Sequence, residues 1–211
     1  MTSPPTAANR VLLLHGIWNA KAWLRPLAAR LRREGFVPEV FGYASVFGGP
    51  EVAVPRLVAR LRDSEPVAVL GHSLGGLIAL EALRRSPGLP VTRVVCLGSP
   101  LRGSGAARGL AGSAWTAPAL GRSASLLQSG FERWDGQPQV GMVAGNVAHG
   151  LGRYFARFEG ESDGTVALEE TRLPGLAAHC VVASSHSGLV FSDAAARQAA
   201  HFLREGRFLV S

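Results

Sequence analysis

The sequence is short of lysine, and its basic charge is not gathered into blocks. Lys21 is the only lysine in a chain of 211 residues with 22 basic side chains and a net charge of +7. The arginines occur singly or in pairs, as in "ARLRREG", and no basic stretch alternates with aromatic residues as single-stranded nucleic acid requires. We therefore expect solvated helix faces, not a nucleic-acid site or a membrane-binding patch.

Long hydrophobic runs are also missing. No apolar stretch approaches the roughly 18 residues that a membrane-spanning helix needs. The N-terminus lacks a basic segment followed by an apolar one, and "RVLLLHG" is too short for a signal peptide. These absences predict a chain that stays in the cytoplasm, where it is made.

Cysteine is scarce, with only Cys96 and Cys180 in the chain. Each lies in an apolar, strand-like run, which favours a buried free thiol. No Cys/His spacing resembles a zinc site. We expect no metal and no organic cofactor.

Short, continuous apolar runs are what the sequence has in quantity. Continuous runs, as opposed to alternating ones, are typical of parallel strands buried on both faces. Helical periodicity separates several of them, and a probable N-cap at Ser192 or Asp193 precedes the last helix. With 47% hydrophobic residues, residues 1–211 are predicted to form one α/β domain: a doubly wound, mainly parallel six-stranded sheet with helices on both faces. The six predicted strands are Val11–Leu14, Val37–Gly42, Val67–Leu70, Val94–Leu97, Val140–Ala144 and Cys180–Ala183.

Two stretches interrupt the alternation, at residues 99–138 and 147–160. Each follows a predicted strand, so each is expected over the carboxyl edge of the sheet, where α/β proteins bind ligands. The first, rich in Gly, Ala, Ser and Arg, could form a small lid.

The segment "GHSLGG" contains the pattern G-x-S-x-G at Gly71, Ser73 and Gly75. The bare pattern is weak evidence, but here it follows a predicted strand and opens a predicted helix. That context indicates a strained elbow presenting the Ser73 hydroxyl at the sheet edge. A Cβ at either glycine would collide with a neighbouring strand or helix.

A serine nucleophile needs a base, and the base needs an orienting acid. On such an elbow the chain order is serine, acid, histidine. Of the six histidines, His186 best fits this order, because it falls between the last predicted strand and the last helix. Asp163 in "GESDGTVAL" is the predicted acid, with Glu161 and the more distant Asp135 as alternatives. The other histidines are His15, His72, His149, His179 and His201.

Two backbone N–H groups should form an oxyanion hole. Leu74 follows the nucleophile and provides one of them, while Ile17, after "HG" at the end of the first strand, is the natural second donor. Trp18 and Leu101, together with Leu74 and other apolar residues of 101–135, are candidates for the acyl pocket. Core packing is their alternative role.

In this order the motifs "HGIW", "GHSLGG", "LGSPLRGS", "SDGTV" and "SHSGLVFS" resemble those of the α/β-hydrolase superfamily, specifically its small bacterial esterases and lipases. The resemblance spans Val11 to Phe191. It implies a minimal fold of six strands, lacking the first two of the full fold. "GSPLRGS" is similar to a loop of lipase-like members and favours ester hydrolysis. A dehalogenase would carry Asp in place of Ser73.

The sequence therefore predicts a serine hydrolase that cleaves small-molecule or lipid carboxylic esters through an acyl-enzyme. A thioesterase or acyltransferase would use the same residues. A binding protein on a hydrolase fold, with the triad reduced to a ligand pocket, is the alternative from another class. The acyl chain, the alcohol and the oligomeric state are left open by the sequence.

Overall fold

The computed structural model of the protein describes residues 9–111, 117–148 and 160–210. Its centre is a six-stranded sheet in the order β2-β1-β3-β4-β5-β6, and every neighbouring pair is parallel. The predicted parallel sheet is confirmed, with strand ends moved by one to three residues. The strands are β1 (Arg10–Leu14), β2 (Val37–Phe41), β3 (Val67–His72), β4 (Val91–Leu97), β5 (Gln139–Gly145) and β6 (Ala178–Val182).

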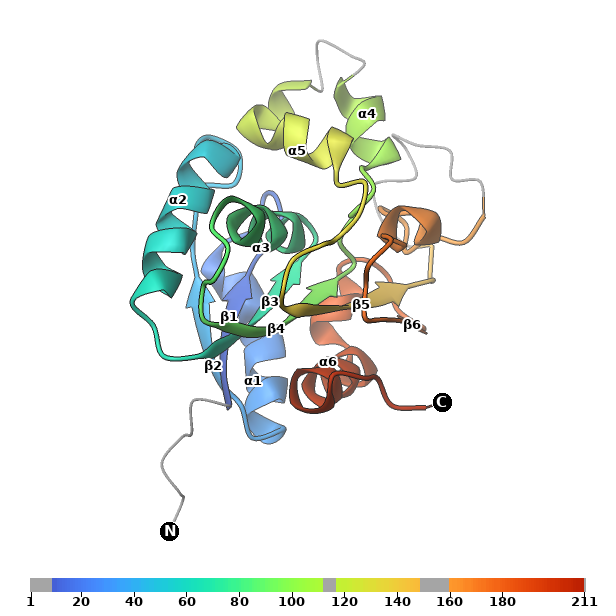
Figure 1. Cartoon of the computed structure of the whole chain (residues 1–211). Helices are drawn as coiled ribbons and strands as arrows, with labels where there is room; N and C mark the ends of the chain where they lie inside the picture. The colour runs from blue at the N-terminus through green and yellow to red at the C-terminus, as the bar shows by residue number, and fades with distance from the viewer. Residues whose placement is uncertain (1–8, 112–116, 149–159, 211) are drawn as a thin grey trace.

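Helices cover both faces of this sheet (Figure 1). On one face lie α2 (Gly49–Arg62) and α3 (Leu74–Arg85), and on the other α1 (Arg25–Arg33) and α6 (Asp193–Glu205). Because successive strand residues point to opposite faces, Leu12 packs with α2 and α3 while Leu13 packs with α1 and α6. This explains why the strands read as continuous apolar runs. The predicted cap is also present, since the Ser192 hydroxyl accepts the Ala195 N–H at 3.1 Å.

The connection from β4 to β5 departs from the regular pattern. It contains α4 (Gly105–Ala111) and α5 (Ala124–Ser129), which lie above α3 at the top of Figure 1. The segment 99–138 therefore begins after the carboxyl end of β4 and returns to the opposite edge of the sheet, where β5 begins. Its role as a small lid stays a prediction. The described residues also include short 3-10 helices, which are η2 (Lys21–Leu24), η3 (Ala117–Ala119), η4 (Gly121–Ser123), η6 (Leu168–Thr171) and η7 (Gly188–Phe191).

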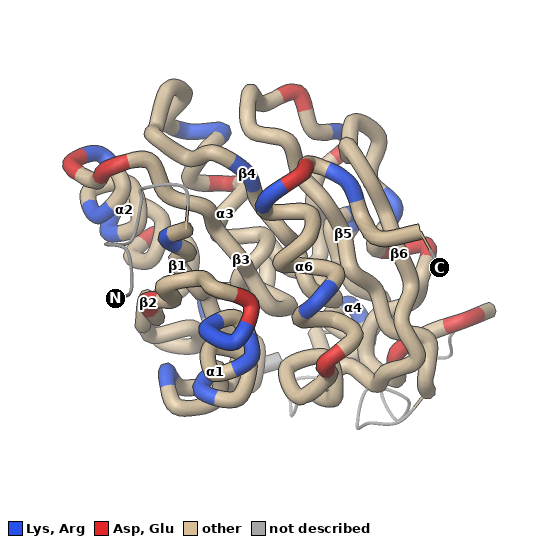
Figure 2. Tube along the Cα trace, turned by 90° about the horizontal axis from the view of Figure 1, so that it is seen from below, with Lys and Arg blue, Asp and Glu red and all other residues tan. Residues whose placement is uncertain are grey.

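Along the chain trace in Figure 2, positions of basic and acidic residues are interspersed. Several arginines form ion pairs. Asp193 at the start of α6 accepts from Arg30 and Arg33 of α1 at 2.8 and 3.0 Å, and Arg60 pairs with Glu39 at 2.6 Å. Part of the excess of arginine side chains therefore forms ion pairs on the surface. Within the described ranges, no helix is both long and apolar enough to cross a membrane.

The two cysteines lie on strands that are not neighbours. Cys96 is on β4 and Cys180 on β6, with β5 between them, and both are free. Two strand spacings are about 9–10 Å, more than the roughly 7 Å between Cα atoms that a disulfide tolerates. Burial raises the pKa of each thiol to about 12, which suppresses the reactive thiolate.

We therefore expect a thiol reagent at pH 8 to react slowly with the native protein and to titrate two thiols after denaturation without reductant. A titration of the free thiols in denatured, unreduced protein checks this directly. No titratable thiol would contradict the strand order described above.

Candidate active site

Three predicted site residues lie at the carboxyl edge of the sheet. Ser73 follows β3, Asp163 lies between β5 and β6, and His186 follows β6. The Nδ1 atom of His186 is 2.7 Å from Oδ2 of Asp163, and the His186 backbone N–H donates to the Asp163 carbonyl at 2.9 Å. Asp163 and His186 are therefore joined through both side chain and backbone.

Ser73 has the strained backbone expected of an elbow. Its φ of 54° and ψ of −121° lie in a region that residues with a Cβ rarely adopt, at a cost of about 1–3 kcal/mol. A Cβ on Gly75 would overlap the Leu14 carbonyl of β1, and one on Gly71 would overlap the backbone of Gly75 and Gly76. Both glycines are thus required by close packing, as the sequence predicted.

The Asp163 carboxylate divides its two oxygens between two tasks. Oδ1 accepts the backbone N–H groups of Thr165 and Val166 at 2.9 and 2.7 Å, in the turn that contains Gly164 with a φ of 88°. Oδ2 faces His186. The side chain is buried, with 1% of its surface exposed. The local turn therefore holds the carboxylate in place and leaves one oxygen for the imidazole.

The two predicted oxyanion donors lie on either side of the elbow. Leu74 is the first residue of α3, so its N–H has no carbonyl one turn earlier in the helix to bond. Gly16 packs directly on the nucleophile, because a Cβ added to it would lie 3.1 Å from the Ser73 Cβ. The peptide between Gly16 and Ile17 is thus next to the hydroxyl, and it carries the second N–H.

A histidine and a tyrosine hold this peptide, and sequence reasoning did not find their roles. The Tyr43 N–H donates to Nε2 of His15 at 3.4 Å, which leaves the proton on Nδ1, and Nδ1 donates to the Gly16 carbonyl at 2.9 Å. Burial lowers the pKa of His15, so the ring is held neutral. In a trans peptide the C=O and the next N–H point in opposite directions. Fixing the Gly16 carbonyl therefore also fixes the direction of the Ile17 N–H.

Tyr43 supports the same histidine in two further ways. Its ring stacks on the His15 ring, with centroids 4.4 Å apart and planes 8° from parallel, and its hydroxyl donates to the His15 carbonyl at 2.5 Å. Tyr43 comes shortly after β2, the neighbour of β1. Its position after a predicted strand was visible in the sequence, but the pairing of the two strands was not.

Gly98, the residue after β4, packs against the pair formed by His186 and Asp163. It has a φ of 58°, and a Cβ there would lie 3.3 Å from both Asp163 Oδ2 and His186 Nδ1. Within the described residues, no hydrogen bond joins the Ser73 hydroxyl to His186. In enzymes without substrate this bond is often long and tightens on binding.

The two predicted pocket residues have different surroundings. Leu101 is fully buried in the core that includes α3, so its side chain has no exposed surface for a substrate. Trp18 is 57% exposed and has a φ of 61°, directly after the oxyanion peptide. Its indole N–H donates to the Ala119 carbonyl at 2.6 Å. The exposed Trp18 therefore links the segment after β1 to the excursion between β4 and β5.

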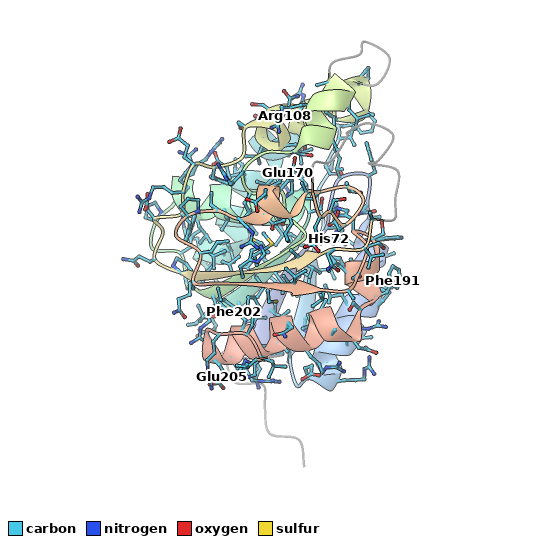
Figure 3. All side chains as sticks on the ribbon, turned by 90° about the vertical axis from the view of Figure 1, so that its right-hand side faces the viewer. His72, Arg108, Glu170, Phe191, Phe202 and Glu205 are labelled. Carbon is cyan, nitrogen blue, oxygen red and sulfur yellow. The ribbon has the colours of Figure 1, made fainter. Side chains whose placement is uncertain are left out.

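The excursion is fastened to the rest of the fold at further points. The Ser123 hydroxyl donates to the Ser45 carbonyl at 2.5 Å, after β2. At the start of α4, Glu170 accepts the Gly105 N–H at 2.5 Å, and its carboxylate lies 4.0 Å from the Arg108 guanidinium. Arg108 and Glu170 are labelled in Figure 3. Burial raises the pKa of Glu170. These contacts join the excursion to loops after β2 and β5.

The alternative acids and bases lie elsewhere. Glu161 is exposed, and Asp135 pairs with Arg133 at 2.6 Å before β5 begins, at the opposite edge of the sheet. His179 contacts Thr171 at 2.8 Å, and His201 lies within α6. His149 lies outside the described residues. Nor do the described residues gather three or more His, Cys, Asp or Glu side chains as a metal site would.

Comparison with known proteins agrees with this architecture. A family model described as alpha/beta hydrolase matches residues 51–117, less than half of the chain, across α2, the elbow, α3 and β4. No curated protein matches the chain in sequence.

Solved structures with similar architecture include hydrolases of several kinds. The mature Bacillus licheniformis lipase BlEst2 has 23% identity and a TM-score of 0.73, over 89% of this chain and 88% of that one. Phospholipase PlaB from Legionella pneumophila has 16% identity and a TM-score of 0.68, over 92% and 56%. The metagenomic carboxyl esterase MGS0156 has 16% identity and a TM-score of 0.65, over 86% and 65%.

Similarity at this level of identity concerns the path of the chain. The parallel sheet with helices on both faces is shared with these neighbours, and the family model covers the segment in which the serine lies. The chain therefore has the α/β-hydrolase fold, as its motifs predicted.

Proposed function

We propose that this protein is a serine hydrolase that cleaves carboxylic esters through an acyl-enzyme. The observation that carries the proposal is the buried His186–Asp163 pair, 2.7 Å apart, at the sheet edge where the strained Ser73 follows β3. The lipase and carboxyl esterase among the structural neighbours support the choice of an ester substrate.

In acylation the Ser73 hydroxyl attacks the ester carbonyl carbon, and His186 Nε2 takes the hydroxyl proton. Asp163 Oδ2 accepts the Nδ1–H of the resulting imidazolium and stabilises its charge. The carbonyl oxygen becomes an oxyanion, which the N–H groups of Ile17 and Leu74 stabilise. When the tetrahedral intermediate collapses, the C–O bond to the alcohol breaks and His186 returns the proton to the leaving oxygen.

Deacylation repeats these steps with water. His186 takes a proton from water as its oxygen attacks the acyl carbon, and the same two N–H groups hold the oxyanion. Collapse releases the carboxylic acid and returns the proton to Ser73. A thioester would follow the same course, so a panel of p-nitrophenyl esters from acetate to palmitate, with an acyl thioester beside it, defines the substrate class.

Replacement of the nucleophile is the first test. Ser73→Ala should lower kcat by a factor on the order of 10⁴–10⁶, because no other group can form the acyl-enzyme. A fluorophosphonate should label the wild-type protein at Ser73 and leave the variant unlabelled, as intact-protein and peptide mass spectrometry would show. Wild-type turnover by a clean Ser73→Ala preparation, or an unlabelled active wild type, would contradict the mechanism.

The acid is tested by Asp163→Asn, for which the structure specifies the outcome. The N–H groups of Thr165 and Val166 require an oxygen at the Oδ1 position, so the new NH₂ group must face His186 Nδ1. An NH₂ donor there forces the His186 proton onto Nε2, where it cannot accept from Ser73. We expect kcat to fall roughly 10⁴-fold, as for the same change in a comparable triad.

Glu161→Gln is the matched control, because Glu161 is exposed and lies two residues away on the same segment. It should keep activity within about threefold of wild type. Both variants are assayed on one short-chain ester at pH 8, after circular dichroism has shown that they are folded. An active Asp163→Asn together with an inactive Glu161→Gln would move the acid to Glu161. Full activity in both variants would show that the acid of the proposed triad does not lie in this segment.

A further inference from the structure

His72, the residue before the nucleophile, contacts the base and is not used by the mechanism above. It is the last residue of β3 and is 2% exposed, within the interior in Figure 3. Its Nε2 lies 3.1 Å from the carbonyl oxygen of His186. The two rings are tilted by 42°, with centroids 4.9 Å apart. His72 therefore touches the base through both its polar atom and its ring.

The hydrogen bond defines the state of the His72 ring. A carbonyl oxygen only accepts, so Nε2 carries the proton and Nδ1 keeps its lone pair. Nδ1 is buried and has no partner within the described residues. Burial, with the neighbouring His186 as a smaller cause, lowers the pKa of His72 to about 3. The ring that packs on the base is thus neutral and does not repel the imidazolium formed during catalysis.

The unpaired Nδ1 makes a purely space-filling role a poor explanation. A buried polar atom without a partner costs stability. An apolar side chain of similar size would fill the same space without that cost. What such a side chain could not supply is the Nε2–H donor toward His186.

The contacts of His186 show what this donor adds. The two hydrogen bonds from His186 to Asp163 fix the base relative to the acid, since both partners belong to that one residue. Neither bond fixes the base relative to the nucleophile. His72 is bonded covalently to Ser73, so its Nε2–H links the backbone of the nucleophile to the backbone of the base.

We propose that His72 is a positioning residue that sets the separation of His186 from Ser73 by donating Nε2–H to the His186 carbonyl. The proposal rests on the proposed function, in which these two residues exchange a proton. Misplacement of a reacting group by about 1 Å can cost roughly 10²-fold in rate. Loss of the donor should therefore lower kcat while substrate binding is kept.

Two variants distinguish the effect of the His72 N–H donor from the effect of its side-chain volume. His72→Leu fills the space without a donor, and His72→Gln keeps an N–H donor near the Nε2 position. On a short-chain p-nitrophenyl ester, we expect His72→Leu to lose about 10–100-fold in kcat with KM within about threefold of wild type. His72→Gln should recover most of the loss. Full kcat in His72→Leu, or an equal loss in a folded His72→Gln, would overturn the proposal.

A second measurement does not depend on turnover. The Nδ1–H of His186, hydrogen-bonded to Asp163, should give a strongly downfield proton resonance in the free protein. The resonance should persist in His72→Gln and shift or broaden in His72→Leu. An unchanged resonance in His72→Leu would overturn the positioning role. If His72→Leu does not fold, as thermal unfolding would show, His72→Met takes its place with the same expectations.

The two measurements also distinguish the two proposals. A wild-type protein that hydrolyses no ester or thioester and takes up no fluorophosphonate at Ser73 would refute the proposed function. The resonance of His186 would still report on the contact with His72 in that case. Conversely, an active and labelled wild type with an insensitive His72→Leu would refute only the role of His72.

Discussion

The turn from β3 into α3 is the constraint on which the rest of the site depends. The chain passes from strand to helix at one residue, and that residue, Ser73, takes a backbone conformation unfavourable for any side chain. The turn depends on the close packing of α3 against the end of β1. Only glycine fits at position 75, because a Cβ there would overlap the Leu14 carbonyl. The close approach of β1 also brings Gly16 against Ser73, so one packing constraint positions both the Ser73 side chain and the segment after β1.

Around this fixed point, loops after several strands are held by hydrogen bonds to backbone groups. The Asp163 carboxylate is held by its own turn, the Gly16–Ile17 peptide by His15 and Tyr43, and His186 forms hydrogen bonds with Asp163 and His72. Each support is buried, and His15 and His72 are kept neutral by burial. The site therefore contains three histidines within a small volume, and only His186 is placed against a carboxylate.

Most of the fold could be predicted from the sequence because a doubly wound sheet leaves a simple signal. Strands buried on both faces read as continuous apolar runs, and the glycines around Ser73 mark the elbow. Chain order predicted Asp163 and His186 as acid and base, and the structure places their side chains in contact, while their catalytic roles stay a prediction. The lining role of Leu101 was an interpretation of its apolar character alone, and the structure buries that side chain in the core.

The supporting contacts could not be predicted in the same way. Tyr43 and His15 meet because β2 is the parallel neighbour of β1, and His72 meets His186 across 114 positions of sequence. Such pairs depend on strand order and on the direction in which each side chain leaves its strand. A single sequence carries the residue types but not these pairings, so His72 was recognisable only as the neighbour of the serine.

The bond between Trp18 and Ala119 has a thermodynamic consequence. It joins the residue after Ile17 to Ala119, 101 positions away, so any movement that separates the segment after β1 from the excursion between β4 and β5 breaks this hydrogen bond. Linkage between two binding sites is reciprocal: if a ligand at one site changes the affinity of the other site for its ligand, the second ligand changes the affinity for the first by the same factor. A molecule that displaced residues 117–123 would change the free energy of the oxyanion loop. An acyl group held in that loop would, reciprocally, change the affinity of the excursion for that molecule.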